Sequence, residues 1–272
     1  MSPAVEKTSP PFARYVAIGD SSTEGVDDRG PDGRFIGWSR RLAAHIQASR
    51  EAQGLEPLQY ANLGVRGRST REILESQLAP AREMQPDLVT LFSGTNDVLA
   101  RRFEPDRLRR DLLALQQPFR REGVAVISFT LPVLTPLMPA ARLVEGRIRT
   151  LNRLLHQVCA ETGTLLIDFD AYAFAVDERF WSEDRLHANG AGHSRIAQAL
   201  ADTLGIAGVD DSWKEPPDVR PAAGLARRLA AEGRWLRRYL LPWLWDKTTG
   251  RTPEPPGPAQ PELAPFRAPE LP

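Results

Sequence analysis

The feature that most constrains this chain is the alternation of short apolar runs with helix-like segments between residues 15 and 204. The runs are short and bounded by turn residues, which is typical of buried strands. Strands that alternate with helices favour a parallel sheet covered by helices on both faces. We therefore predict a five-stranded α/β sheet. Its predicted strands are 15–18, 58–63, 87–92, 124–131 and 164–169.

The segments between these runs carry apolar residues on one helical face. Trp38, Leu42 and Ile46, spaced by four, form such a stripe, and this period indicates an amphipathic helix. The compact domain should end near Gly208. The predicted helices are 37–53, 70–83, 105–122, 141–162 and 189–204.

The composition excludes several classes of protein. With 42% hydrophobic and 26% charged residues, the chain is typical of a globular protein with a core. The 35 basic and 35 acidic residues balance, so charge gives no argument for a nucleic-acid partner. A single cysteine allows no intrachain disulfide. Residues 1–11 do not resemble a signal peptide and no run of 18 apolar residues occurs, so we expect a cytoplasmic protein.

The composition changes after the predicted domain, which we place at 12–208. Residues 209–224 read as a polar linker. Residues 225–247 read as a basic, Trp-rich amphipathic helix, which would either pack on the domain or a partner chain, lie on a membrane surface, or meet an acidic protein. Residues 250–272 contain eight prolines and should be disordered or polyproline-like.

Candidate site residues follow three of the predicted strands. Ser21, Gly64 and Asn96 come after the first, second and third strands, and Asp184 and His187 precede the last helix. In open α/β sheets this edge is where ligands bind. Each residue also has a structural interpretation: a helix cap for Ser21 or Asn96, a turn for Gly64, and a solvated surface for the Asp-x-x-His pair.

Together these residue types indicate nucleophilic catalysis. A serine hydroxyl needs a base within hydrogen-bond reach, and histidine has a suitable pKa. A carboxylate three residues before the histidine can orient the imidazole. The Ser21 and Gly64 backbone amides and the Asn96 side chain are candidate donors to an oxyanion.

Four blocks of the chain resemble the SGNH hydrolases, also called GDSL-type esterases and lipases. The blocks are 19–25 (GDSSTEG), 62–64 (NLG), 94–97 (GTND) and 184–187 (DRLH), within 12–208. The resemblance implies a flavodoxin-like three-layer α/β/α sandwich. It implies Ser21 as nucleophile, His187 as general base, Asp184 as its orienting acid, and an oxyanion hole of Ser21, Gly64 and Asn96. It also implies a small-molecule ester substrate and no metal or organic cofactor.

Three hypotheses follow. The first is a serine esterase acting on small acyl or acetyl esters, including a sugar deacetylase. The second is a catalytically idle SGNH-like module that binds a ligand or partner through the same cleft. The third is a metal-dependent phosphoesterase built on Asp20, Asn96, Asp97 and His187, although the chain has few histidines for such a site.

Overall fold

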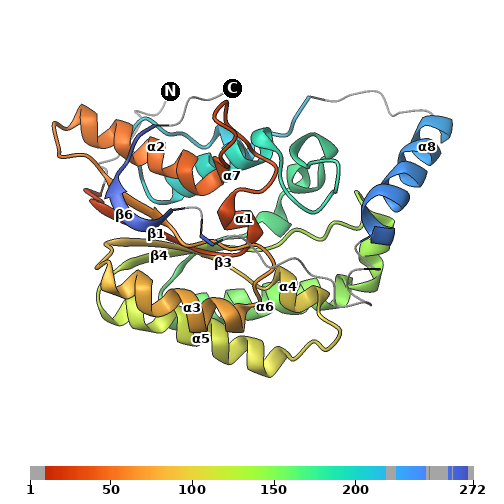
Figure 1. Ribbon diagram of the computed structural model, residues 1–272, viewed down its shortest axis with the longest axis horizontal. Coiled ribbons are helices and arrows are strands. Elements are labelled where there is room, and N and C mark those ends of the chain that lie inside the picture. Colours follow the sequence, from red (N-terminus) through yellow and green to blue (C-terminus); the bar gives the residue numbers. More distant parts are fainter. Residues whose placement is uncertain (1–9, 219–224, 243–244, 246–256, 259, 269–272) are drawn as a thin grey trace, which may run out of the picture.

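A six-stranded sheet, with one strand more than the five predicted, forms the centre of the molecule. The computed structural model describes residues 10–218, 225–242, 245, 257–258 and 260–268. In this part of the chain the strand order is β5-β4-β3-β1-β2-β6 (Figure 1). The first five strands pair in parallel, as predicted, and β6 pairs antiparallel with β2. The strands are β1 Arg14–Gly19, β2 Gln59–Asn62, β3 Leu88–Phe92, β4 Ala125–Phe129, β5 Leu165–Ile167 and β6 Gln260–Pro265.

Helices cover both faces of the sheet, which confirms the three-layer α/β/α prediction. Figure 1 shows α2 and α7 on one face and α3, α5 and α6 on the other. Two short helices, α1 and α4, follow β1 and β3 directly. The bounds are α1 Ser21–Glu24, α2 Gly37–Ala52, α3 Thr70–Glu83, α4 Thr95–Leu99, α5 Pro105–Arg121, α6 Glu145–Thr162 and α7 Gly190–Thr203.

Successive residues of β1 face opposite layers, since side chains alternate along a strand. Tyr15 and Ala17 join a cluster with residues of α2 and α7, whereas Val16 and Ile18 join a cluster with residues of α3 and α5. All four side chains are fully buried. The sequence of β1 is therefore a continuous apolar run, because this strand has a core on each side.

The connections after β4 and β5 are built from short 3₁₀ helices. The sequence predicts one helix over residues 141–162. In the structure a short helix, η1 Pro139–Leu143, precedes α6, and the helix is interrupted at Val144. After β5 come η2 Phe169–Ala171, η3 Ala173–Val176 and η4 Glu178–Phe180. These turns carry the loop that leads to Asp184 and His187.

The domain extends past the predicted end at Gly208. Residues 212–214 form η5 Ser212–Lys214, and the Trp213 side chain is buried. Its ring packs against those of Phe169 and Tyr172, with centroids 6.0 and 4.9 Å apart. The first part of the predicted linker therefore belongs to the domain, and residues 219–224 lie outside the described residues.

The Pro-rich tail supplies the sixth strand, which corrects the prediction of a disordered segment for residues 260–265. The Phe266 N–H donates to the Leu58 carbonyl at 2.7 Å, and the buried Phe266 ring packs edge-on against Tyr60 at 5.7 Å. Prolines are tolerated here because β6 is an edge strand, where the N–H groups of one side have no ladder partner.

The predicted C-terminal helix is present as α8 Leu225–Trp235, which continues into a π-helical turn, η6 Leu236–Leu240. It lies at the opposite end of the molecule from β6 (Figure 1). Trp235 is buried, and Trp235 and Tyr239 bond to residues 184 and 183. Of the interpretations left open for this segment, packing against the domain is the one that these contacts support.

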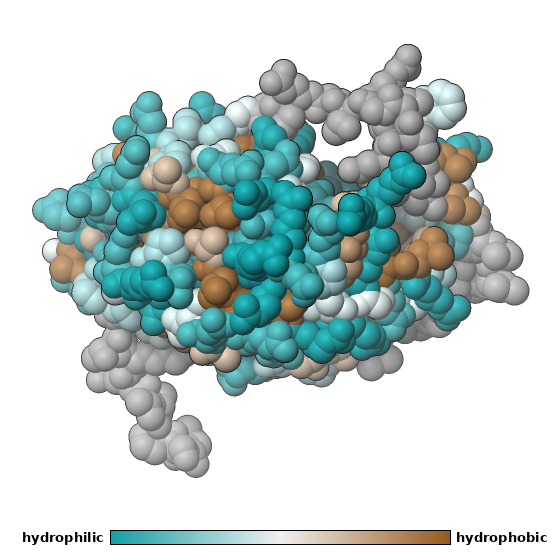
Figure 2. All heavy atoms as spheres, turned by 90° about the horizontal axis from the view of Figure 1, so that it is seen from below, coloured by the Kyte–Doolittle hydropathy of each residue, from teal (hydrophilic) through white to brown (hydrophobic). Residues whose placement is uncertain are grey.

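The face of the molecule that is seen from below is predominantly hydrophilic (Figure 2). Figure 2 shows the molecule from below, with hydrophobic residues as separated patches among hydrophilic ones. No helix among the described residues combines the length and the apolar character needed to cross a bilayer.

Candidate active site

Ser21 is presented by a sharp turn at the end of β1. Gly19 has φ 154°, and a Cβ there would lie 2.2 Å from the Thr23 hydroxyl and 2.4 Å from the Phe92 carbonyl oxygen. Asp20, and not Ser21, is the N-cap of α1, since its carboxylate accepts from the Ser22 N–H at 3.0 Å. The Ser21 hydroxyl is therefore not used as a cap.

A second loop brings a histidine to this hydroxyl. The His187 Nε2 lies 2.9 Å from the Ser21 Oγ, and its Nδ1 lies 2.6 Å from the Asp184 Oδ2. The other Asp184 oxygen accepts from the backbone N–H groups of Leu186 and His187 at 2.8 and 3.0 Å. The structure thus brings together Ser21, His187 and Asp184, as predicted, in one chain of contacts.

The charges of this pair stabilise each other. Burial raises the pKa of Asp184, but the hydrogen bond and charge of His187 outweigh it and bring the pKa to about 2. Burial lowers the pKa of His187, but Asp184 raises it more, so the net pKa lies above the usual 6.5. Asp184 therefore stabilises an imidazolium that keeps its proton on Nδ1 and carries a second one on Nε2, the state that a general base reaches after it takes a proton.

Two residues that the sequence analysis missed support the same loop. The Ser182 hydroxyl lies 2.7 Å from Asp184 Oδ1 and 2.8 Å from Asp27 Oδ2. Asp27 Oδ2 is itself 3.9 Å from His187 Nδ1. Asp27 adopts φ 68°, an uncommon conformation for a residue with a side chain. Its place beside the imidazole follows from the 27–34 loop, which carries no sequence signal for it.

The candidate oxyanion donors are only partly brought together. Asn96, at the start of α4, lines the cavity, and its Nδ2 donates to the Arg68 carbonyl at 3.0 Å and contacts Asp20 Oδ2 at 3.4 Å. The Ser21 N–H is the first of α1 and has no intrahelical acceptor.

Gly64 departs from the prediction. Its N–H donates to the Asn62 side chain at 2.9 Å, and it is not among the residues that line the cavity. A Cβ at Gly64 would lie 2.6 Å from the Glu24 nitrogen. Close approach of the α1 backbone thus gives a packing reason for a glycine at this position.

Two acidic residues near the site, Asp20 before α1 and Asp97 in α4, have structural partners. Asp20 is buried, and burial raises its pKa to about 7. Asp97 Oδ2 accepts from the Thr70 N–H and hydroxyl at 2.9 and 2.8 Å, which ties α4 to the start of α3. The four residues predicted as metal ligands therefore contact different partners and do not form one ligand cluster. They are Asp20, Asn96, Asp97 and His187.

The described residues hold another group of possible metal ligands: Asp27, Asp184 and His187, with ligand atoms within 4.8 Å of one another. Two of these atoms, His187 Nδ1 and Asp184 Oδ2, are bonded to each other. A cation would have to break that contact, so the donor set fits an orienting pair better than a metal site.

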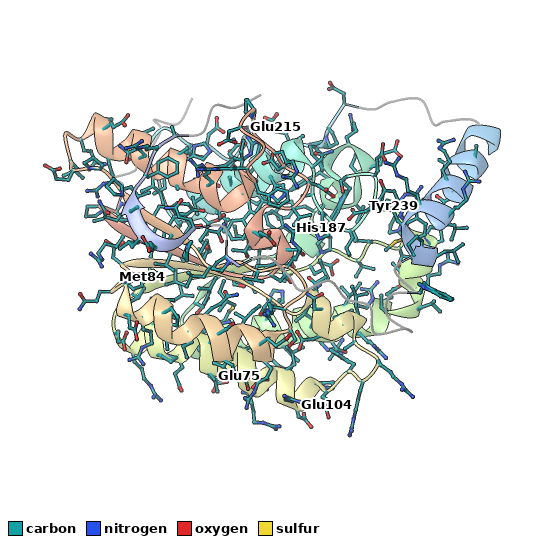
Figure 3. The ribbon with its side chains drawn as sticks, viewed as in Figure 1. Glu75, Met84, Glu104, His187, Glu215 and Tyr239 are labelled. Carbon is teal, nitrogen blue, oxygen red and sulfur yellow. The ribbon has the colours of Figure 1, made fainter. Side chains whose placement is uncertain are left out.

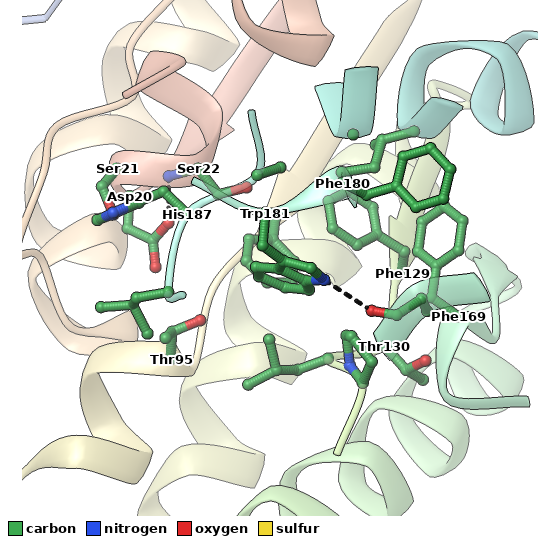
Figure 4. A pocket seen from close by; sticks show the side chains of 18 of the residues that line it. Asp20, Ser21, Ser22, Thr95, Phe129, Thr130, Phe169, Phe180, Trp181 and His187 are labelled. Carbon is green, nitrogen blue, oxygen red and sulfur yellow. Dashed lines mark hydrogen bonds between the residues drawn. The ribbon is translucent and has the colours of Figure 1, made fainter. Parts of the chain in front are cut away.

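An apolar cavity of about 90 Å³ opens beside Ser21 and His187. Figure 4 shows the polar residues Ser21 and His187 at one side and the aromatic rings of Phe129 and Phe169 at the other, with Trp181 between them. The Trp181 indole N–H donates to the Ala175 carbonyl at 2.9 Å, which fixes the ring. These aromatic residues are far apart in sequence, and core periodicity alone could not assign them to a cavity.

The remaining histidines lie away from the Ser21 hydroxyl. His193 is buried, and its Nδ1 accepts from the Trp38 N–H at 3.0 Å, so it supports the core between α7 and α2. His156 lies 3.3 Å from Asp168 on the surface of α6. His45, within α2, has a pKa lowered by burial.

A serine, a histidine and an aspartate in contact at the carboxyl edge of a parallel sheet form the arrangement that serine hydrolases share. The chain belongs to the GDSL-like Lipase/Acylhydrolase family, whose model matches residues 17–195. It is accordingly a hydrolase of the esterase and lipase class. A comparison with curated protein sequences found no match.

Solved structures share this fold. LAE5, an alpha/beta hydrolase enzyme from the metagenome of Lake Arreo, is 25% identical, with 71% of this chain and 95% of that chain covered and a TM-score of 0.59. Axe2, an acetylxylan esterase from Geobacillus stearothermophilus, is 21% identical (76% and 99% covered, TM-score 0.58). The lipase/acylhydrolase from Enterococcus faecalis is 22% identical (76% and 100% covered, TM-score 0.57).

Proposed function

We propose that this protein is a serine esterase that hydrolyses carboxylic esters of short acyl groups through an acyl-enzyme. The observation that carries the proposal is the chain of contacts from Ser21 Oγ to His187 Nε2 and from His187 Nδ1 to Asp184, at the mouth of an apolar cavity. Nucleophile, base and orienting acid then stand in the order that acyl transfer needs.

The reaction follows from these contacts. The Ser21 oxygen attacks the ester carbonyl while His187 Nε2 takes its proton. The resulting imidazolium is stabilised by Asp184 and returns the proton to the leaving alcohol. Water, activated in turn by His187, releases the acid from Ser21.

The oxyanion donors that we propose are the Ser21 N–H and the Asn96 side-chain amide. The Asn96 amide donates to the Arg68 carbonyl at 3.0 Å and to Asp20 at 3.4 Å, so on our proposal the longer contact is given up when the N–H turns to the oxyanion. Gly64 would join them only if its N–H left Asn62. Removal of one oxyanion donor in such a site costs about a hundredfold in kcat.

The small cavity argues for a short acyl chain. Its volume of about 90 Å³ is below the roughly 150 Å³ of an apolar cavity that accepts benzene. We therefore expect acetate and butyrate esters to be hydrolysed with higher kcat/KM than octanoate esters. An acetylated sugar fits the same acyl preference, as the name of Axe2 would suggest.

The test is hydrolysis of p-nitrophenyl acetate, butyrate and octanoate by the wild type, Ser21→Ala and Ser194→Ala, with and without a chelator. Ser194 is a half-buried α7 serine that does not line the cavity, so its variant should behave as the wild type. We expect Ser21→Ala to lose activity and the chelator to have no effect. Loss of activity on chelation would favour the metal-dependent phosphoesterase.

A serine-directed phosphonate separates an idle module from an enzyme with a narrow substrate. The wild type should gain one phosphonyl group on Ser21, and Ser21→Ala none. A wild type that neither hydrolyses the three esters nor reacts with the phosphonate would sink the esterase proposal and favour the idle binding module.

The preference for short acyl chains can be tested by a substitution in the cavity wall. Phe180 lines the cavity and lies against Arg195 at 4.5 Å, so Phe180→Ala should raise the octanoate to butyrate ratio of kcat/KM. Phe103, another half-buried phenylalanine with an arginine (Arg147) over its ring at 5.7 Å, lies outside the cavity and serves as control. An unchanged ratio in Phe180→Ala would mean that the acyl chain lies elsewhere.

A further inference from the structure

A second cavity, of about 690 Å³, adjoins the candidate active site. It lies between the loop before His187 and the helical segment α8–η6. Trp181 lines both this cavity and the apolar cavity beside Ser21. Figure 3 shows Tyr239 of η6 on the α8 side of His187. Because the two cavities share Trp181, a group bound here adjoins the candidate active site.

The second cavity carries an excess of positive charge. Of its four arginines, Arg185 pairs with Glu232 at 2.6 Å and Arg238 with Glu183 at 3.2 Å. Arg234 and Arg237 form no ion pair within the described part of the chain. Glu178 is the remaining carboxylate of the wall. Among the residues that the structure describes, two guanidinium groups without an ion pair therefore line the cavity together with one further carboxylate.

The wall that carries these arginines is fixed to the loop of the active site. The Trp235 indole N–H donates to the Asp184 carbonyl at 2.9 Å, and the Tyr239 hydroxyl donates to Glu183 at 2.9 Å. The Arg185 guanidinium lies 5.2 Å from the Trp235 ring. Three successive loop residues, Glu183, Asp184 and Arg185, thus hold α8–η6 in place. The walls of the cavity are therefore fixed by contacts of the folded protein.

We propose that this cavity binds a phosphate group carried by the alcohol portion of the ester substrate. The inference rests on the proposed esterase function and adds a substrate class to it. The cavity beside Ser21 is mostly apolar and suits the acyl group, and its one arginine, Arg195, lies over the rings of Phe174 and Phe180. Guanidinium groups are well suited to phosphate, which they bind by paired charge-assisted hydrogen bonds.

The aromatic residues of the same cavity define the rest of the ligand. Trp181, Trp235 and Tyr239 supply flat apolar faces beside the arginines, against which the carbon skeleton of a phosphorylated alcohol can pack. In the reaction water and the ester give the free acid and the phosphorylated alcohol. The acyl C–O bond breaks and the phosphate ester stays intact.

Two esters with the same scissile bond test the proposal: 1-butyrylglycerol and 1-butyrylglycerol 3-phosphate, followed by acid release. The wild type should show a kcat/KM for the phosphate ester about tenfold higher, the effect of one charge-assisted hydrogen bond. The preference should shrink in 0.5 M salt, which screens exposed charges. Equal kcat/KM for the two esters would overturn the proposal.

Charge-matched variants locate the effect. R234Q/R237Q should lose the preference for the phosphate ester. R110Q/R121Q, which removes two exposed arginines from α5 on the other face of the sheet, should keep the wild-type ratio. A wild-type ratio in R234Q/R237Q would show that the phosphate is not bound in this cavity.

Binding to Ser21→Ala, measured by calorimetry, separates the phosphate site from the esterase function. Glycerol 3-phosphate should bind and glycerol should not. If it binds while no ester is hydrolysed, the anion site stands and the esterase proposal fails. If it does not bind, and the chain binds only anionic phospholipid vesicles through Arg234 and Arg237, the site is a membrane contact and the substrate proposal is overturned.

Discussion

At the residue scale, the contact between Ser21 and His187 depends on the turn that precedes it. Gly19 adopts a conformation that is unfavourable for a residue with a side chain, and the Phe92 carbonyl occupies the place of its Cβ. The backbone of β3 therefore passes close to the end of β1. The sharpness of this turn directs Ser21 toward the carboxyl edge of the sheet.

Gly19→Ala should therefore destabilise the protein by roughly 2–4 kcal/mol, because backbone strain and a contact with backbone atoms add up. Gly33→Ala is the matched control, since Gly33 has φ 76° but no atom within 4 Å of the place that a methyl group would take. It should cost only about 1 kcal/mol. Urea unfolding measures both, and equal losses would refute the steric part of the argument.

On the proposed mechanism, His187 should set the pH dependence of activity. Burial lowers its pKa and Asp184 raises it by more, to above 6.5. The base must be neutral to take a proton, so kcat/KM should rise with pH through a pKa above 6.5. Asp184→Asn should reduce kcat by about 10³- to 10⁴-fold and move this limb to lower pH. A limb that stays in place would show that another group titrates.

At the element scale, α8–η6 supports the loop that carries the catalytic candidates. Arg185, in the middle of that loop, adopts φ 60°, which is uncommon for a non-glycine residue. Its ion pair with Glu232 and its contact with Trp235 offset this strain. The helix therefore helps to hold Asp184 and His187 at the positions that Ser21 requires.

Trp235→Phe removes the indole N–H that bonds the Asp184 carbonyl and keeps an aromatic ring. We expect kcat to fall about five- to tenfold, the value of one hydrogen bond of about 1 kcal/mol, with little change in KM for a neutral ester. Trp213→Phe is the control, because it also removes a buried indole N–H, which bonds Asp202. A loss of stability alone in both variants would assign Trp235 a merely structural role.

The edge strand β6 shows how an element without a clear pattern can still belong to the sheet. Its burial alternates weakly, and its sequence contains two prolines. The strand is defined instead by pairing with β2 and by Phe266, which covers Tyr60. Prolines indicated disorder because that prediction considered the segment alone, without the unpaired edge of β2.

At the scale of the whole molecule, a buried imidazole joins α7 to α2. Burial lowers the pKa of His193 to about 4, and its Nδ1 accepts from the Trp38 N–H. The unfolded chain has a pKa near 6.5 at this residue, so it binds more protons than the folded protein between these values. Folding stability should therefore decrease as the pH falls from about 6.5 to about 4.

The effect of His193 is about 3 kcal/mol over this range. His193→Asn keeps a side-chain acceptor but cannot be protonated there. The difference in unfolding free energy between the wild type and His193→Asn, measured in urea at pH 7 and pH 4.5, should therefore shift by about 2–3 kcal/mol against the wild type. A constant difference would mean that His193 does not control the acid stability.

The sequence by itself determined the parallel five-stranded part of the α/β/α architecture and the residues that we propose for the site. Apolar runs such as 15–18, alternating with amphipathic helical segments, favour a parallel sheet covered by helices on both faces. The positions of Ser21 and Asn96 at strand ends, and the Asp-x-x-His spacing of Asp184 and His187, are local features, so they could be predicted without coordinates. The roles of these residues in catalysis remain a proposal.

Only the tertiary structure decided which residues share a space. Gly64 makes its hydrogen bond to Asn62, Ser182 and Asp27 join the histidine loop, and the tail supplies β6. The second cavity forms only where Trp181 and α8–η6 lie side by side, although more than 40 residues separate them in the sequence. Such contacts depend on how distant segments pack, and no periodicity or local spacing encodes that.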